Sequence, residues 1–258
     1  MKSHDENFVI NLAINVGKIM LESGAEIYRV EETIERMITS KLDSKVDVFV
    51  LPTGIIVSVK SSTNSTTRLE RIHSSQLNLE AISRANSFSR IYTQNDLSDE
   101  DLEILLTSLT DIPQFSKRTT FIFTGIAGGL FTGLTGGSIL ETLVAFVASI
   151  SVGYLLTKLA RFKPNFFIKN IIGGFLIAGI GVLSYFIFEK FGFYLDYNRI
   201  IIGPLMTLVP GVALTNGIRD LISGELIAGG AKIIEAIFIA IALAFGVGIA
   251  LQISFAFI

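Results

Sequence analysis

The feature that most constrains this chain is an apolar segment that contains a helix break and ends in charged residues. Positions 207–236 read TLVPGVALTNGIRDLISGELIAGGAKIIEA, with Pro210 and Gly211 in the apolar part. Arg219 and Asp220 follow shortly after. Proline disrupts the preceding helical turn, and the backbone groups it leaves free are tolerated at membrane depth only against protein or a water-filled cavity. Because transport sites are commonly built at such breaks, the segment indicates a membrane protein that moves a small polar solute.

Composition divides the chain into two parts. Half of the 258 residues are hydrophobic and the mean hydropathy is +0.59, which is too apolar for an ordinary soluble protein. Residues 1–118 hold 13 Lys/Arg and 17 Asp/Glu, whereas residues 119–258 hold eight and six. We therefore predict an α-helical integral membrane protein. Its domains are an N-terminal cytoplasmic α+β domain at 1–116 and five transmembrane helices at 117–258.

Several functional classes are not supported by the residues present. The chain has no cysteine, which excludes disulfides and thiolate catalysis, and it has no basic patch that would indicate nucleic acid. The two histidines are far apart in sequence, and no HExxH, P-loop, GxSxG or nucleotide-binding glycine motif is present. We predict no catalytic residue, no metal site and no cofactor, and expect the soluble domain to regulate or gate.

The soluble domain is expected to contain two helices, a three-stranded meander and two more helices. Apolar residues at helical spacing lie in the first segments, and alternating or β-branched residues lie in the middle. Ser98 and Asp101 have the spacing of a capping box at the start of the last helix. The expected helices are 7–22, 25–38, 76–92 and 99–110, and the expected strands are 46–52, 54–61 and 66–73.

Five apolar segments follow, each close to the roughly 20 residues that span a bilayer as a helix. They lie at 119–135, 139–158, 167–188, 200–217 and 233–257. Lys and Arg are concentrated before the first segment, between the second and third, and between the fourth and fifth. The positive-inside rule then predicts a multi-pass protein of the cell membrane with the N-terminus in the cytoplasm and the C-terminus outside.

Small residues recur every fourth position on four of these segments. Such stripes let helix backbones approach closely in lipid, where apolar burial no longer drives association. They predict a tightly packed bundle and do not identify a solute. The stripes are Gly125, Gly129, Gly133 and Gly137; Ala145, Ser149, Gly153 and Thr157; Gly203, Thr207, Gly211 and Thr215; and Ala236, Ala240, Ala244 and Gly248.

The polar residues around the break are the candidate solute ligands. Thr207, Thr215 and Asn216 could bond a polar solute or, alternatively, the carbonyls freed in their own helix. A zwitterionic amino acid needs a cation for its carboxylate and an anion for its ammonium, and Arg219 and Asp220 supply both signs beside the break. The alternative for this pair is an orientation signal at the membrane interface.

Two glutamates are candidates for proton coupling. Glu141 follows the sequence GLTGGS near the outer end of the second segment, and Glu235 lies in the first turn of the fifth. A carboxyl group in a low-dielectric site has a raised pKa, which suits proton exchange. The alternatives are snorkelling of Glu141 to the interface and a local ion pair between Glu235 and Lys232.

Four blocks resemble the signature blocks of the threonine/serine exporter family and occur in that family's order. The resemblance implies a cytoplasmic N-terminal domain and ion-driven export, as by an antiporter, of small hydrophilic metabolites such as threonine, serine or dicarboxylates. The blocks are LAINVGKIMLESGAEIYRVEETIERM (12–37), LPTGIIVSV (51–59), GIAGGLFTGLTGGSILETLVAF (125–146) and TLVPGVALTNGIRDLISGELIAGGAKIIEA (207–236).

The resemblance also bears on partners. Single-chain members of that family carry a second membrane domain, so this chain resembles the larger subunit of the split form. We expect a second short membrane subunit, a homo-oligomer, or both. The competing hypothesis is a membrane-anchored sensor or scaffold whose cytoplasmic domain binds a ligand or protein. A simple anchor needs neither the Pro-Gly break nor glycine ladders on several segments, which favours transport.

Overall fold

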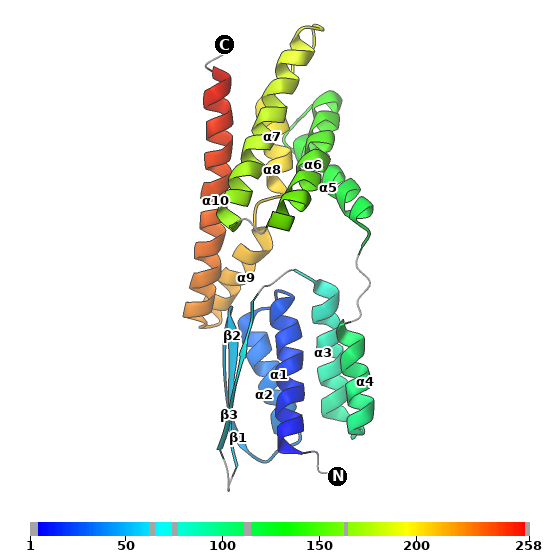
Figure 1. Ribbon diagram of the computed structural model, residues 1–258, viewed down its shortest axis with the longest axis vertical. Helices are drawn as coiled ribbons and strands as arrows, with labels where there is room; N and C mark the ends of the chain where they lie inside the picture. Colours follow the sequence, from blue (N-terminus) through cyan, green and yellow to red (C-terminus); the bar gives the residue numbers. More distant parts are fainter. Residues whose placement is uncertain (1–4, 62–64, 74–76, 111–114, 163–164, 256–258) are drawn as a thin grey trace. The chain divides into compact units, whose positions relative to one another are not determined.

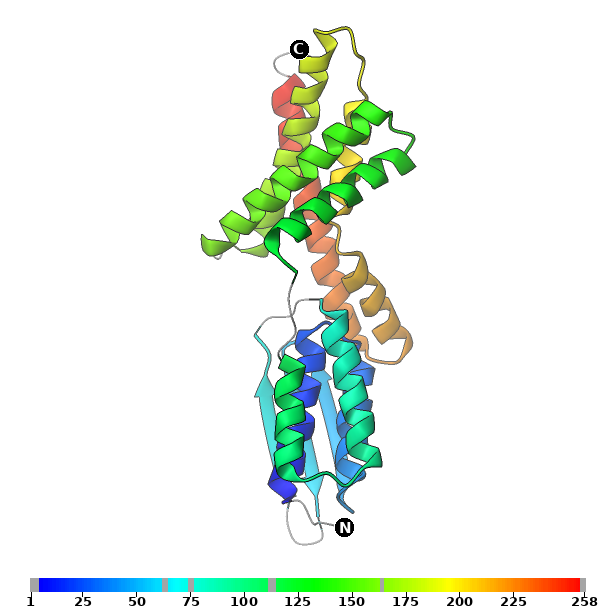
Figure 2. The ribbon, with the colours of Figure 1, turned by 90° about the vertical axis from the view of Figure 1, so that its right-hand side faces the viewer.

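A computed structural model describes residues 5–61, 65–73, 77–110, 115–162 and 165–255 of the chain (Figures 1 and 2). The chain forms two compact units. The first unit contains Met1–Pro113 together with Val212–Ile234, and the second contains Gln114–Gly211 together with Glu235–Ile258. The first unit therefore includes a segment that the sequence assigned to the membrane part.

The first unit has the predicted order of elements. Ser98 caps the last of its four N-terminal helices, because its Oγ accepts the N–H of Asp101 at 3.2 Å. The elements are α1 (Glu6–Glu22), α2 (Ile27–Thr39), β1 (Lys45–Leu51), β2 (Gly54–Lys60), β3 (Ser65–Arg71), α3 (Leu79–Gln94) and α4 (Asp99–Thr110).

These elements form three layers. The antiparallel sheet has the order β1-β2-β3 and packs through its inner face against α1 and α2, while α3 and α4 pack on the other side of α1 (Figure 1). The inner face buries Val50, Ile55, Val57 and Val59. The predicted apolar stripe of α2 is confirmed, since Ile27, Val30, Ile34 and Met37 have no exposed surface.

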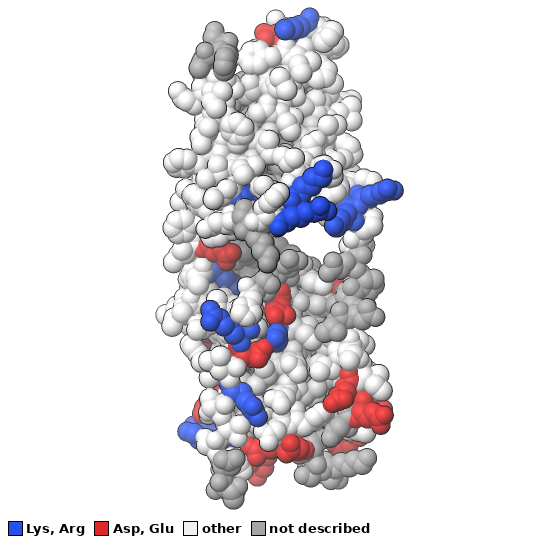
Figure 3. Space-filling model, in the orientation of Figure 1, with Lys and Arg blue, Asp and Glu red and all other residues white. Residues whose placement is uncertain are grey.

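The remaining helices are apolar. They are α5 (Lys117–Leu134), α6 (Ile139–Leu159) with the short 3-10 helix Ala160–Phe162, α7 (Phe166–Glu189), α8 (Tyr197–Met206), α9 (Gly211–Ile222) and α10 (Leu226–Phe255). Among the described residues three helices, α6, α7 and α10, are long and apolar enough to cross a membrane, and the broken pair α8–α9 would make a fourth. On the face shown in Figure 3 the second unit is mostly uncharged, apart from a group of Lys and Arg at one end and a few charged residues at the other. The protein is a multi-pass membrane protein.

Small residues set helix contacts of the second unit, but the predicted stripes are confirmed only in part. Gly125, Gly129, Ala145, Ser149 and Gly203 are buried, whereas Gly133, Thr157, Gly211 and Thr215 are exposed. On α5, Gly128 lies against Ser149 of α6 and Pro204 of α8, and Gly203 of α8 lies against Thr132 of α5. Thr132 Oγ1 contacts both its own helix, at Gly128 O, and the carbonyl oxygen of Arg199 in α8 (3.2 Å). Backbones of these helices therefore approach as closely as a missing side chain allows.

The predicted stripe on the fifth segment is wrong for three of its four residues. In α10 only Ala236 of that stripe is buried, whereas Ala240, Ala244 and Gly248 are exposed. The contact with α7 uses Gly246 instead, which lies against the carbonyl of Ile171. The helix offers small residues on two faces, and the spacing alone could not show which face packs.

Substitution of the contact glycines should destabilise the second unit. A side chain at Gly174 of α7 would collide with the carbonyl oxygen of Leu243, and one at Gly246 with that of Ile171. We expect Gly174→Val and Gly246→Val each to cost about 1–3 kcal/mol or more, seen as a lower midpoint of thermal unfolding in detergent. Gly179→Val and Gly248→Val are matched controls because open space surrounds both glycines. Equal losses in all four variants would contradict the assigned contacts.

Candidate functional site

The turn between α1 and α2 is the polar centre of the first unit. Gly24 adopts a φ of 83°, a left-handed conformation that favours glycine, and α2 begins at Ile27. The N-cap residue Glu26 makes no side-chain capping bond. The first amides of α2 therefore have no acceptor from a local cap.

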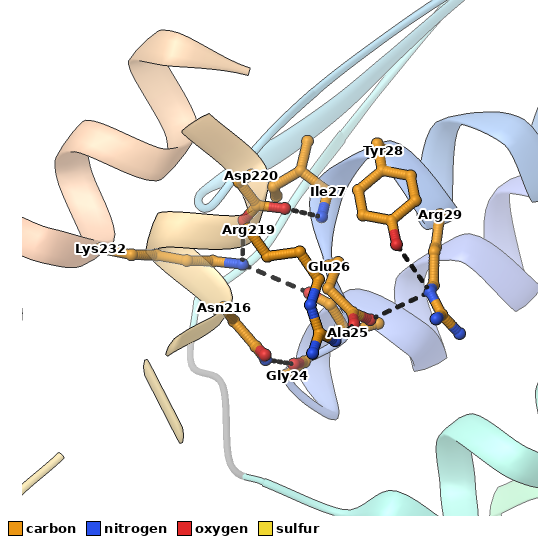
Figure 4. Close-up of polar contacts among 10 residues, drawn as sticks. All are labelled: Gly24, Ala25, Glu26, Ile27, Tyr28, Arg29, Asn216, Arg219, Asp220 and Lys232. Carbon is orange, nitrogen blue, oxygen red and sulfur yellow. Dashed lines mark hydrogen bonds and ion pairs between the residues drawn. The ribbon is translucent and has the colours of Figure 1, made fainter. Parts of the chain in front are cut away.

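Asp220 of α9 supplies an acceptor. Its Oδ1 accepts a hydrogen bond from the N–H of Ile27 at 2.9 Å, and its Oδ2 accepts one from Lys232 Nζ at 2.8 Å (Figure 4). Asp220 has no exposed surface, and the Lys232 side chain is largely buried. A carboxylate is stable in such surroundings only when it is paired and hydrogen-bonded, and here both oxygens are engaged. Negative charge at the start of α2 also suits the helix dipole.

Three further contacts hold the same turn. Asn216 Nδ2 donates to the carbonyl of Gly24 at 3.0 Å, and Lys232 Nζ donates to the carbonyl of Ala25 at 3.3 Å. The guanidinium of Arg219 pairs with the carboxylate of Glu26.

Each of the four consecutive residues at 24–27 is thus held by one side chain from α9 or α10 (Figure 4). We call these four residues and their partners Asn216, Arg219, Asp220 and Lys232 the corner clamp.

Helix geometry explains how α9 can make three of these contacts. Asn216, Arg219 and Asp220 are spaced i, i+3 and i+4 and therefore share one face of the helix. Close packing of α9 on the start of α10 brings the fourth partner, Lys232, beside them. A side chain at Gly229 would meet the carbonyl oxygen of Gly217 at 2.7 Å, so glycine is needed at this crossing.

Two glutamates near the clamp have opposite pKa shifts. Burial opposes ionisation of Glu26, but its own backbone N–H and the charges of Arg219 and Arg29 outweigh burial and lower its pKa. Burial raises the pKa of Glu31, and the nearby charges of Glu225, Glu35 and Asp220 raise it further. Glu31 Oε1 also accepts the N–H of Val50 at 2.8 Å, which only partly offsets these effects.

The predicted break is confirmed, but the residues around it lie in different units. No helix is present at 207–210, between α8 and α9. Thr207 belongs to the second unit and its Oγ1 donates to the carbonyl of Pro204 at 2.7 Å. Thr215 and Asn216 belong to the first unit, Thr215 being exposed and Asn216 engaged with Gly24.

Thr207 also borders a surface groove of about 580 Å³ on the second unit. One wall is the face of α5 that carries Thr119, Thr120 and Thr124, with phenylalanine rings between the hydroxyls. Thr124 Oγ1 donates to the carbonyl of Thr120 at 2.9 Å, which leaves its oxygen free to accept another bond. The groove therefore combines apolar surface with a short row of hydroxyls.

The two predicted proton-coupling residues differ in environment. Glu141 is buried and serves in a capping box, its Oε2 accepting the N–H of Ser138 and its Oε1 that of Asp196, both at 2.6 Å. The snorkelling alternative for Glu141 is therefore wrong. Glu235 is exposed on α10, and Lys232 pairs with Asp220, so no ion pair joins Lys232 to Glu235 in this part of the described structure.

Sequence reasoning missed Gly24, Glu26 and Glu31 as members of this region. The available signal was local: a helix that starts after glycine without Ser, Thr, Asp or Asn at its N-cap. Within the described ranges, no three histidine or carboxylate side chains converge as metal ligands would.

Comparison with known proteins gives the relatives of the chain. The ThrE threonine/serine exporter family matches residues 11–254. A Corynebacterium glutamicum protein named "Threonine/serine exporter" is 23% identical over 254 residues, which cover 95% of this chain and 51% of that protein. A Mycobacterium tuberculosis protein named "Probable threonine/serine exporter" is 22% identical over 251 residues, or 95% and 46%. The chain spans about half the length of these relatives, and no solved structure matches it.

The raised pKa of Glu31 predicts a pH-dependent effect of its replacement. Because the folded protein disfavours the Glu31 carboxylate, ionisation of this group reduces stability as pH rises through its folded pKa. Glu31→Gln should therefore raise the midpoint of thermal unfolding at about pH 7.5, and the gain should vanish near about pH 3.5, where Glu31 is protonated in both states. Glu32→Gln is the control, since Glu32 is exposed on the same helix in a surface ion pair. A gain that persists at the lower pH would contradict this origin.

Proposed function

Because the chain belongs to the threonine/serine exporter family, we propose that it forms part of a secondary transporter that exports small hydrophilic metabolites, chiefly threonine- and serine-like amino acids. The observation that carries the proposal is the family match, which runs through both compact units. Apolar helices and a broken helix beside polar residues are consistent with it. On this basis the protein is a transporter and not an enzyme, and dicarboxylates are the second class of solute to test.

We propose that the solute path begins at the break after α8. Thr207 and the hydroxyl row of α5 offer acceptors and donors beside a groove large enough for an amino acid. Pro210 and Gly211 form the break itself, where the N–H of Gly211 donates to the carbonyl of Val209 at 2.8 Å. The direct solute role predicted from the sequence for Thr215, Asn216, Arg219 and Asp220 is the alternative path, and it would require Asn216, Arg219 and Asp220 first to release their partners in the corner clamp.

For coupling to the proton gradient, Glu235 is the stronger of the two candidates. It is exposed on an apolar helix, whereas both carboxylate oxygens of Glu141 already accept backbone N–H bonds. Removal of Glu141 would break the start of α6 as well as any proton step. Glu235→Gln therefore offers the cleaner test of an antiport mechanism.

The proposed topology keeps five spans with the N-terminus in the cytoplasm and the C-terminus outside. α5 would be the additional span: Lys117 and Arg118 at its start suit the inner interface, and the rest of the helix is uncharged. A second membrane part, from another subunit or another copy, completes the proposal because the relatives are about twice as long. The exposed small residues Ala240, Ala244 and Gly248 on α10 are suited to pack against such a helix.

One observation favours the alternative, a membrane-anchored sensor or scaffold. On the outer face of the sheet, Phe49, Ile56 and Leu69 are aligned by strand register and form an apolar row, with Phe49 and Leu69 clearly exposed. The row borders a hollow of about 250 Å³ with Arg71 at its edge. An exposed apolar row on a soluble domain is typical of a ligand or protein contact. Such a contact could also regulate an exporter.

Export is tested in the host cell. Deletion of the gene should slow efflux of preloaded threonine and serine, and the intact gene should restore it, while an uncoupler that collapses the proton gradient should slow efflux in both restored and parental cells. Succinate efflux in the same cells tests the dicarboxylate option. Unchanged efflux of all three solutes would contradict an exporter and favour the sensor.

The solute path is tested by thiol labelling, since the native chain has no cysteine. We expect Thr207→Cys to react with a water-soluble maleimide and threonine to slow the reaction, because the solute would cover this position. Gly179→Cys on α7 is the control, being surrounded by open space on an apolar helix that should face lipid or protein. If Thr207→Cys reacts no faster than Gly179→Cys from either side of the membrane, the proposed path is wrong.

A further inference from the structure

We propose that the corner clamp is a positioning device for export, through which the cytoplasmic helices α1 and α2 set the place of α9 and of the start of α10. Glu26, Arg219, Asp220 and Lys232 are then positioning residues that act without touching the solute. The inference rests on the proposed function, but its structural part can be measured without transport.

The polar groups of the clamp are already bonded to one another, which argues against a vacant solute site there. Both oxygens of Asp220 are engaged by groups of the protein, and the residue has no exposed surface. Arg219 is half exposed but already holds a carboxylate, that of Glu26. A zwitterionic solute would have to replace Lys232 and Glu26 at the same time and leave both unpaired, which is costly for the buried lysine.

The composition of the clamp indicates that it selects one arrangement of α1 and α2 and contributes little to stability. A buried ion pair contributes little stability compared with apolar residues of similar size. Three of the four residues at 24–27 are held through backbone groups and only Glu26 through its side chain, so the clamp recognises chiefly the path of the chain. That path depends on the left-handed conformation of Gly24. The clamp is thus suited to detect how α1 and α2 meet.

The chain connections link the clamp to the second unit. α9 directly follows the break at 207–210, and α10 runs as one helix from Leu226 in the first unit to Phe255 in the second. The clamp holds α9 by three side chains and α10 by Lys232. A shift of the turn at 24–27 therefore acts on both α9 and the start of α10. Each of these segments is joined along the chain to the second unit, α9 through the break at 207–210 and α10 through its own C-terminal part.

Kinetics of export separate positioning from solute binding. We expect Glu26→Gln and Arg219→Gln each to lower the maximal rate of threonine export per folded protein about fivefold or more, with the half-saturating concentration unchanged. The double variant should be no slower than the worse single variant, since both break one contact. If Arg219 binds solute, Arg219→Gln instead raises the half-saturating concentration and Glu26→Gln leaves it unchanged or lowers it, which would overturn the proposal.

A matched control excludes a merely structural role. Lys18 and Glu70 form an ion pair elsewhere in the first unit, with intermediate exposure on both sides. Glu70→Gln should leave export per folded protein at the parental rate, as judged against the monodisperse fraction in detergent. If Glu26→Gln and Arg219→Gln also keep the parental rate per folded protein, the clamp only supports folding and the proposal fails.

Labelling without solute keeps the inference separate from the proposed function. Val209→Cys lies in the break and is accessible. Adding Glu26→Gln or Arg219→Gln should change its rate of reaction with a maleimide several-fold, whereas adding Glu70→Gln should not. A changed rate in a protein that exports nothing would support the clamp and contradict the exporter. An unchanged rate in a protein that exports normally would overturn the clamp alone.

Discussion

The first unit depends on the buried carboxylate of Asp220. Removing a charge from water is costly, and only the combined contacts to the Ile27 amide and the Lys232 ammonium make it tolerable. Those contacts require the start of α2, the end of α9 and the start of α10 to meet at one point. This requirement explains why 212–234 belongs to the same compact unit as the N-terminal helices, although the start of this segment was predicted to belong to a membrane span.

The second unit follows a different physical rule. Its helices expose large apolar side chains such as Leu183 and Phe245, so burial of apolar surface does not decide which helices meet. Close approach decides instead, at positions where only glycine fits, as for Gly203 against α5 and Gly246 against α7. Polar contacts therefore fix α10 at Lys232, and close steric contacts fix the same helix at Gly246.

Local sequence patterns predicted those features of the fold that depend on interactions between residues close in sequence. The alternation of β1 to β3, the apolar stripe of α2, the cap at Ser98 and the break at Pro210 were all readable, because each depends on residues within a turn or two. The stripe on the fifth segment failed because α10 has small residues on two faces and the partner helix selects one. The clamp was unreadable because Ile27 and Asp220 are 193 positions apart, and only the missing N-cap at Glu26 hinted that a distant acceptor was needed.

Linkage connects the clamp to proton binding in the first unit. Burial is the main cause of the raised pKa of Glu31, but the charge of Asp220 is one of the repulsive contributions, alongside Glu225 and Glu35. If Asp220 raises the pKa of Glu31 in the clamped arrangement, a proton on Glu31 must favour that arrangement over one in which Asp220 is further away. Glu26 behaves in the opposite way: its lowered pKa keeps it charged and paired with Arg219 as pH falls into the range where Glu31 becomes protonated. Acidification therefore neutralises Glu31, and with it the repulsion of Asp220, before it neutralises Glu26, which pairs with Arg219.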